Sequence, residues 1–230
     1  MKLILTRVTT DPVMAIEEAA ANCYDSTPST AGKIMDHCYK SGHTSVLEFC
    51  TFTFHVEGVS RALLAQHTRH RHASFAVQSQ RYVDKRDFEY ITPRSIQNNP
   101  VVLEKYDELM AAIGEFYVFA IDNGIAKEDA RYALPNACDT TFEFSINLRS
   151  LLNFMNLRLC TRAQWEIRQL ALAMKKAIVE QYPAFEKYLV PKCEANAPYY
   201  FCTEQKCCGR HPKLKEVYKG YESSKESGNS

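Results

Sequence analysis

Residues 61 to 83 contain a concentration of cationic side chains and no acidic one. Four arginines and three histidines occur in this window: Arg61, His67, Arg69, His70, Arg71, His72 and Arg81. A guanidinium group binds phosphate oxygens two at a time and keeps its charge at any cellular pH. Gln78, Ser79 and Gln80 add neutral donors. The window predicts a site for a phosphorylated ligand; the alternative is a solvated loop whose charges pair with acidic residues elsewhere.

A second donor-rich stretch covers twelve residues, with Asn147, Arg149, Asn153 and Arg158 set among leucines, a phenylalanine and a methionine. Arg149 and Asn153 are four residues apart, so they share one face of a helix. Arg131 is a further candidate on a short helix. The alternative for this stretch is an amphipathic helix with an ordinary polar side.

The C-terminal part is rich in cysteine. Within nineteen residues the chain carries five possible zinc ligands: Cys193, Cys202, Cys207, Cys208 and His211. Thiolate and imidazole groups suit zinc, but the spacing fits no C-x2-C pair, and adjacent cysteines do not easily bind one ion together. Structural thiols or a surface motif are therefore favoured over a zinc site. Cys23, Cys38 and Cys50 are expected in the core.

Composition limits the class of protein. The chain has 230 residues, 46% of them hydrophobic, with 28 Lys+Arg against 27 Asp+Glu. A net charge of +1 argues against a general nucleic-acid coat or a polybasic membrane anchor. No run of 18 apolar residues occurs, and the N-terminal apolar run is too short for a signal peptide. We expect a cytoplasmic protein with reduced thiols and no membrane partner.

The elements that must position these residues alternate between helices and strands. Helices are expected over residues 12–24, 29–40, 60–67, 99–122, 127–134, 150–160 and 163–182, with Asp11 and Asn99 as caps before prolines. Period-two alternation predicts strands at 50–56 and 141–146. Residues 68–81 are read as a loop, and residues 82–92 as short strands. The pattern indicates an α+β fold without a βαβ rhythm.

Several common catalytic and binding motifs do not occur. The sequence has neither a G-x-G-x-x-G after a strand nor a G-x-x-x-x-G-K-[ST] phosphate loop. It also lacks H-E-x-x-H and G-x-S-x-G. A bound nucleotide would therefore rely on side chains for much of the positive charge.

Arg69-His70-Arg71, followed after seven residues by Ser79, resembles the R-H-R-x7-S signature of the flavin-dependent thymidylate synthase family. Further matches follow in the family's order: Gln66, Arg81-Tyr82, Arg131, Leu134-Pro135-Asn136, Asn147-x-Arg149, Asn153 and Asn156-Leu157-Arg158. The resemblance covers roughly residues 1–190. It implies one domain there, with a mostly antiparallel sheet flanked by helices. Residues 191–230 would be a cysteine-rich extension, with a disordered end at 223–230.

The resemblance implies an activity, the methylation of dUMP to dTMP. Methylenetetrahydrofolate would give the carbon, FAD would carry the hydride, and NADPH would reduce the flavin. Arg158 matches the arginine that polarises or ionises the uracil ring, which makes it the expected catalytic residue. Ser79 lacks a partnering base nearby in sequence, so it is expected to bind substrate rather than to attack it. The family's homotetramers share their sites between subunits.

The resemblance also implies two residue sets. The dUMP set comprises Gln66, Arg69, Val77, Gln78, Ser79, Gln80, Arg81, Arg131 and Arg158. The FAD set comprises His43, Ser45, Arg69, His70, Arg71, Val77, Asn147, Arg149 and Asn153. His43 has an alternative role as a turn residue after Gly42. Ala76, Val77 and Arg162 depart from residues common in the family, which bears on flavin affinity.

Two other functions compete with this one. A nucleotide- or RNA-binding module would use the arginine cluster with Phe75 and Tyr82 as stacking partners. The balanced net charge weakens that interpretation, and we expect no nucleic-acid partner. An inactive structural relative would keep the fold alone, as the departure at Ala76-Val77 would allow.

Overall fold

The structure is a computed structural model that describes residues 1–218. The predicted disordered end at 223–230 lies outside the described residues. The chain forms two compact units. The first combines Met1–Arg7 with Thr53–Ser145, and the second combines Val8–Phe52 with the residues from Ile146 onward. One domain over residues 1–190, followed by an extension, stays a prediction.

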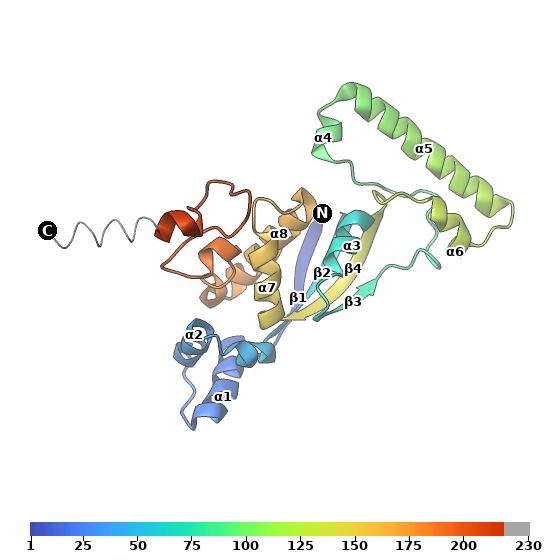
Figure 1. The fold of residues 1–230 in the computed structure, drawn as a ribbon. Coiled ribbons are helices and arrows are strands. Elements are labelled where there is room, and N and C mark those ends of the chain that lie inside the picture. The colour runs from blue at the N-terminus through green and yellow to red at the C-terminus, as the bar shows by residue number, and fades with distance from the viewer. Residues whose placement is uncertain (219–230) are drawn as a thin grey trace. The chain divides into compact units, whose positions relative to one another are not determined.

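Four strands form one antiparallel sheet in the order β1-β2-β4-β3 (Figure 1). They are β1 (Lys2–Val8), β2 (Thr51–Ser60), β3 (Ala73–Val77) and β4 (Asp139–Asn147). Buried and half-buried residues alternate along β4 and most of β2, as period-two strands require. The predicted α+β class with a mostly antiparallel sheet is confirmed.

An aromatic cluster forms the core of the first unit. The rings of Phe54 and Phe144 stack at 5.1 Å, and that of Phe75 stacks on Phe144 at 5.9 Å. The buried ring of His67 meets Phe144 edge-on at 4.5 Å. His67 ends α3 (Arg61–His67), whose N-terminus is capped by Ser60: its Oγ accepts from the backbone of Leu63 at 3.0 Å. This packing fixes the point from which the basic residues leave the helix.

The first unit also contains the helices α4 (Arg94–Gln97), α5 (Pro100–Asp122) and α6 (Lys127–Ala130) and the 3-10 turn η2 (Arg131–Ala133). The helix predicted over 99–122 is confirmed, since Asn99 caps it by accepting from the backbone of Val102. Tyr117 and Ala120 of α5 pack on Ala130 of α6. This contact positions the turn that carries Arg131.

The second unit contains α1 (Pro12–Tyr24), α2 (Lys33–Lys40), η1 (Thr44–Phe49), α7 (Leu148–Arg158), α8 (Trp165–Gln181), η3 (Pro183–Phe185) and η4 (Lys192–Glu194). The helices predicted around 12–24, 150–160 and 163–182 are confirmed within a few residues. The cap predicted at Asp11 is wrong, because its backbone is left-handed and its side chain accepts no capping bond. The prediction that Cys23 is a core residue is also wrong, since it is exposed, whereas Cys38 and Cys50 are buried.

Three further predictions are wrong. The helix expected from Ser29 begins at Lys33, because Gly32 is left-handed at φ 65° and the buried Glu17 accepts the backbone N–H groups of both Ser29 and Met35. The predicted loop 68–81 contains strand β3, and β1 was not predicted at all. Residues 82–92 form no strand beyond one isolated bridge from Tyr90 to Cys138. For β1 and β3, pairing across the sheet decides the structure more than the local pattern does.

Candidate functional site

Residues 69–81, the basic segment, start where α3 ends and include edge strand β3. Arg69 and Arg71 are exposed, and neither forms an ion pair with any carboxylate of residues 1–218. His70 is half-buried, with its ring centroid 6.3 Å from that of His67. Two guanidinium groups are thus exposed to solvent beside a half-buried histidine.

Gln78 is held by its backbone on both sides. Its N–H donates to the carbonyl of Thr141 at 2.9 Å, and its own carbonyl accepts from the Arg61 guanidinium at 2.6 Å. Its side-chain Oε1 is buried and has no hydrogen-bond partner within the described chain. Burial lowers the pKa of Arg61, but a guanidinium group keeps its positive charge at cellular pH. A fixed backbone and an unused side-chain acceptor suit Gln78 to a ligand contact.

Glu128 brings two predicted dUMP-binding residues together. Its carboxylate pairs with Arg81 Nη2 at 2.8 Å, and its backbone carbonyl accepts from Arg131 Nε at 3.0 Å. The first contact matches the alternative reading of the basic window, in which its charges pair with acidic residues. That reading holds for Arg81 but not for Arg69 and Arg71 within the described residues.

Ser79 lies in a turn. Its hydroxyl oxygen accepts from the backbone of Arg81 at 3.2 Å, which leaves the hydroxyl hydrogen able to donate. Gln80 Nε2 lies 3.5 Å from the buried thiol of Cys138. Gln66 on α3 and Val77 at the end of β3 are half-buried. The Ser79 contacts are those of a positioned donor, since no histidine or carboxylate of the described chain bonds its hydroxyl.

In the second unit, three predicted flavin residues lie in α7 or cap it. Asn147 caps the helix by accepting from the backbone of Ser150 at 2.9 Å. Arg149 and Asn153 are both exposed, as expected for residues on one polar face. Arg149 also pairs with Glu48 at 2.6 Å. That exposed pair is weak enough for a stronger anion to displace.

His43 and Ser45 flank the start of η1 and are exposed. Gly42 is left-handed at φ 78°, and the backbone N–H of His43 donates to Cys38 at 2.8 Å. These features agree with the alternative interpretation of His43 as a turn residue after Gly42.

Arg158 ends α7, where a cation is favoured by the partial negative charge of the helix C-terminus. It is half-buried and lines a cavity of about 280 Å³. Arg162, Cys193, Cys208 and His211 line the same cavity. The predicted catalytic residue thus shares a cavity with the cysteine-rich segment. The sequence had predicted that segment as an extension outside the domain that carries Arg158.

Similarity to known proteins decides the family. The family described as "Thymidylate synthase complementing protein" matches residues 4–184. A flavin-dependent thymidylate synthase of Geobacter sulfurreducens is 36% identical over 232 residues, covering 95% of this chain and 98% of that protein. The chain belongs to this family. The family prediction and the prediction that the chain is an enzyme are both confirmed.

Other members of the family support the same assignment. The flavin-dependent thymidylate synthase of Clostridium tetani is 36% identical over 248 residues, covering 95% of this chain and 97% of that protein. That of Pyrococcus furiosus is 43% identical over 144 residues, covering 61% of this chain and 59% of that protein. Within residues 1–218 no helix is both long and apolar enough to cross a membrane. The cytoplasmic location stays a prediction.

Three contacts that hold predicted site residues were not predicted from the sequence. Arg61 holds the Gln78 carbonyl, Glu128 joins Arg81 to Arg131, and Glu48 pairs with Arg149. Arg61 lies inside the acid-free window, so the composition of that window indicated that this residue has a role in the site. Glu128 and Glu48 lie 47 and 101 residues from their partners, and nothing in the local sequence marks those pairings.

Proposed function

We propose that this chain methylates dUMP to dTMP, with methylenetetrahydrofolate as carbon donor and NADPH as the source of reducing equivalents. The observation that carries the proposal is the family match over residues 4–184 on a chain that retains the R-H-R-x7-S residues. Family membership supports this reaction, and the exposed arginines would give this chain a means to bind its anionic substrates.

The nucleotide set supplies complementary donors. The phosphate of dUMP would meet guanidinium groups from Arg69, Arg81 and Arg131, each able to bind two oxygens. Arg81 would exchange its pairing with Glu128 for the phosphate, a change that costs little at an exposed ion pair. Ser79 would donate its hydroxyl hydrogen close to the reacting ring. The role of Gln66, Val77 and Gln80 is to complete this pocket.

The residues present also fit FAD, which carries a hydride when bound. Its two phosphates need fixed cations, and Arg69 and Arg71 are exposed without an acidic partner in residues 1–218. Gln78, whose Oε1 is buried and unbonded there, adjoins Val77 and can accept from a ring N–H. His43, Ser45, His70, Asn147, Arg149 and Asn153 complete the flavin set. Asn147 would serve it while capping α7.

Arg158 is the residue we assign to the chemistry. Carbon 5 of uracil becomes nucleophilic when negative charge on the N3/O4 side of the ring is stabilised, and a fixed guanidinium does this electrostatically. Arg158 keeps its positive charge at any cellular pH and is half-buried, so its field is less screened than that of a surface cation. No cysteine is required, because polarisation replaces covalent attack on the ring.

We also propose a homotetramer with shared sites. Helix α5 carries a series of exposed apolar side chains: Val101, Val102, Leu109, Phe116 and Phe119. Apolar exposure of this kind on one helix is typical of a surface covered by another subunit. Sedimentation analysis of the pure protein tests this assembly, and a monomer at assay concentration would contradict it.

The function is tested with the Arg158→Ala variant. We expect yellow protein that keeps its oxidised flavin spectrum while dTMP formation falls about 100- to 1,000-fold, the loss typical when a transition-state charge loses its stabilising donor. Arg94→Ala, which removes an exposed arginine outside both predicted sets, serves as the matched control. Rescue of a thymidine-requiring strain by the wild type, but not by Arg158→Ala, is the cellular readout.

Two results would overturn the proposal. One is a colourless wild-type protein that takes up no added FAD, as an RNA-binding module would be. The other is full dTMP formation by Arg158→Ala, which would remove that residue from the chemistry.

A further inference from the structure

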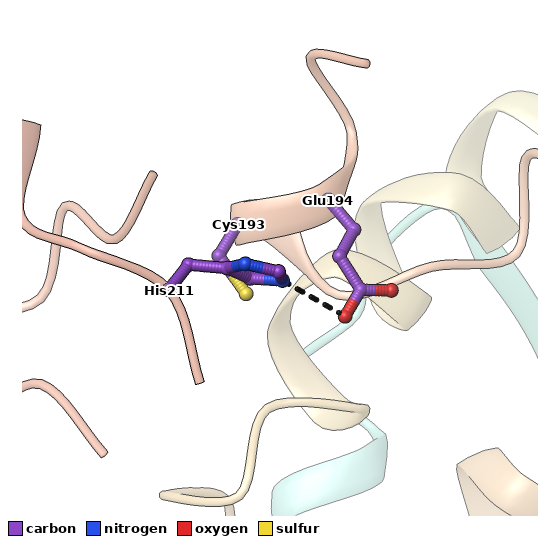
Figure 2. A group of neighbouring side chains, drawn as sticks. All are labelled: Cys193, Glu194 and His211. Carbon is purple, nitrogen blue, oxygen red and sulfur yellow. Dashed lines mark hydrogen bonds and ion pairs between the residues drawn. The ribbon is translucent and has the colours of Figure 1, made fainter. Parts of the chain in front are cut away.

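The C-terminal segment gathers metal-binding side chains that the methylation reaction does not use. Cys193 Sγ, a carboxylate oxygen of Glu194 and a ring nitrogen of His211 lie within 4.8 Å of one another (Figure 2). Cys193 and Glu194 come from η4, whereas His211 follows Glu194 by 17 residues. All three residues are half-buried. A thiol, an imidazole and a carboxylate together are a donor set that zinc favours.

The spacing of these atoms is close to that of a closed site. Ligands at zinc–sulfur, zinc–nitrogen and zinc–oxygen bond lengths lie about 3.3–3.8 Å apart around a tetrahedral ion. The three atoms here lie no more than 4.8 Å apart. Side-chain rotations that move each atom by about 1 Å therefore bring them to bonding positions. These three atoms would supply three of the four ligands of a tetrahedral site.

Glu194 is only loosely held by its present partners. One of its oxygens lies 3.3 Å from Arg210 Nε and 3.3 Å from His211 Nε2. Well-formed hydrogen bonds between an ionised donor and a carboxylate are shorter, at about 2.7–2.9 Å. The ring of His211 is supported on another side by Tyr200, at a centroid distance of 5.2 Å. The carboxylate can therefore turn to an ion while the imidazole stays in position.

Cys202 is the best placed fourth ligand. It is buried, and it lines the same cavity as Cys193 and His211. Its backbone N–H donates to the carbonyl of Pro212 at 2.8 Å, and an isolated bridge joins it to Lys213, so it is fixed beside the residue that follows His211.

We propose that Cys193, Glu194, Cys202 and His211 bind one Zn²⁺ ion that closes the segment from Cys193 to His211 into a loop. This segment contains only one 3-10 turn and one isolated bridge, with Cys202 as its buried apolar residue. Such a stretch has little hydrophobic surface with which to fold, and a structural zinc ion supplies that free energy directly. The ion would also fix the wall of the cavity lined by Arg158.

Metal analysis of the full-length protein tests this site independently of its enzymatic activity. After expression in zinc-supplemented medium and purification without a chelator, we expect one zinc per chain. Cys193→Ser, Cys202→Ser and His211→Gln should each retain less than about a tenth of that amount after the same dialysis. Replacing zinc by Co²⁺ in the wild type should give a thiolate-to-cobalt charge-transfer band, which reports ligation without any variant.

Two matched controls separate ligands from other thiols. Cys23→Ser removes an exposed thiol in α1, and Cys208→Ser removes an exposed thiol of the same cavity that is outside the proposed ligand set. Both should keep one zinc per chain. Zinc-free wild-type protein without a cobalt band would overturn the proposal. Loss of zinc in Cys208→Ser with full retention in Cys202→Ser would show that the ligand set is wrong.

Discussion

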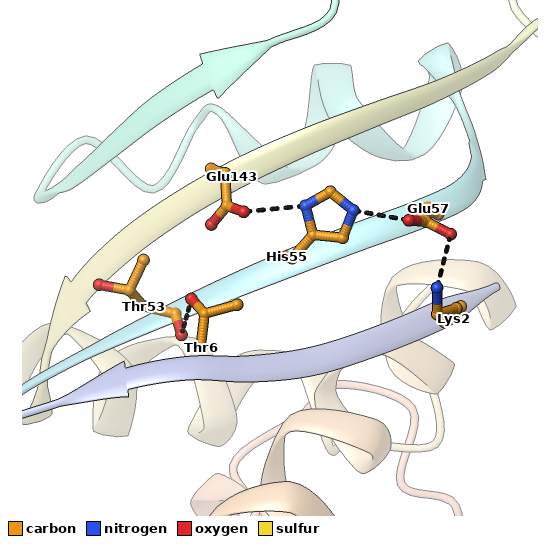
Figure 3. A network of polar contacts seen from close by, with 6 residues as sticks. All are labelled: Lys2, Thr6, Thr53, His55, Glu57 and Glu143. Atoms are coloured by element: carbon orange, nitrogen blue, oxygen red, sulfur yellow. Dashed lines mark hydrogen bonds and ion pairs between the residues drawn. The ribbon is translucent and has the colours of Figure 1, made fainter.

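Two parts of the first unit differ in whether their charged side chains form ion pairs. On the polar face of the sheet, His55 lies between two carboxylates, 2.8 Å from Glu143 and 2.7 Å from Glu57, and Glu57 also pairs with Lys2 at 3.2 Å (Figure 3). In the basic segment, Arg69 and Arg71 form no ion pair with any carboxylate of residues 1–218. The sheet satisfies its charges internally, whereas the basic segment keeps two available for a ligand.

The difference follows from where each group lies. Neighbours on one face of a sheet are set by strand register, so His55 of β2 meets Glu143 of β4 directly. The basic segment follows the end of α3 and includes an edge strand, and residues 61–83 contain no acid. Its charges can be paired only by distant residues, as Arg81 is by Glu128. The charges around His55 are therefore paired within the sheet, whereas Arg69 and Arg71 form no ion pair within residues 1–218.

The largest expected effect tests whether the stability of the sheet comes from its aromatic face rather than from its polar one. Phe144→Ala removes a buried ring that contacts Phe54, Phe75 and His67. It should lower the free energy of unfolding by about 3–5 kcal/mol, the usual cost of such a cavity. Denaturant unfolding measures this, with Tyr132→Ala, which removes an exposed ring in η2, as control. Equal losses in both variants would contradict the assignment of the core.

Removing an arginine from each of two charge environments tests the comparison itself. Arg71→Ala should weaken FAD binding about 100-fold, because a bidentate guanidinium–phosphate contact is worth roughly 3 kcal/mol. Its unfolding free energy should stay within about 0.5 kcal/mol of the wild type. Arg86→Ala, which removes an arginine paired with Asp122 at 2.7 Å, should leave FAD affinity unchanged. Flavin fluorescence titration distinguishes them, and a destabilised Arg71→Ala with normal affinity would reverse the comparison.

Much of the fold could be predicted because its signals are local. Alternating residues defined β2 and β4, and proline after Asn99 marked the start of α5. Strands β1 and β3 were not predicted because apolar and polar residues do not alternate clearly in their sequences. Their extended backbones depend on hydrogen bonds to β2 and β4. Secondary structure that depends on a distant partner leaves little trace in its own sequence.

The candidate site was also predictable only where its signals are local. Residue types and the family motif indicated Arg69, Arg71 and Ser79, since their chemistry is visible one residue at a time. Their supporting contacts were not predictable, because Arg61 reaches Gln78 across 17 residues and Arg81 reaches Glu128 across 47. The metal ligands behave in the same way: Cys193 and His211 were noticed, but Glu194 became a candidate only when the chain was folded.

A smaller effect is expected from Arg61, a positioning residue that acts through the carbonyl of Gln78. Arg61→Met keeps much of the side-chain volume but removes the donor at 2.6 Å. We expect KM for dUMP to rise about tenfold, consistent with loss of one hydrogen bond to a charged group, while kcat at saturation changes little. Arg61→Lys restores a donor and should recover part of the loss. A fall in kcat at unchanged KM would argue against a positioning role.

The smallest effect concerns pH and the partnered side of the comparison. Hydrogen bonds to Glu57 and then Glu143 raise the pKa of His55 above its ordinary value of 6.5. Its contribution to stability is therefore fully present below 6.5 and is lost as pH rises through the higher value of the folded state. The pKa of Glu57 is lowered from 4.5, chiefly by His55, so its contribution is present above 4.5 and is lost as pH falls through the lower folded value. The network should stabilise most between about 4.5 and 6.5.

His55→Gln keeps hydrogen-bonding capacity but cannot gain a proton, so it isolates this charge. The difference in Tm between wild type and His55→Gln should be largest near pH 6 and should shrink as the pH is raised towards 9. His72→Gln is the matched control, since His72 is exposed in the basic segment and pairs with no carboxylate of residues 1–218. Its Tm difference should not follow that pH dependence. A difference for His55→Gln that grows with pH would show that the histidine between two carboxylates is held neutral, and the network would then be one of ordinary hydrogen bonds rather than of paired charges.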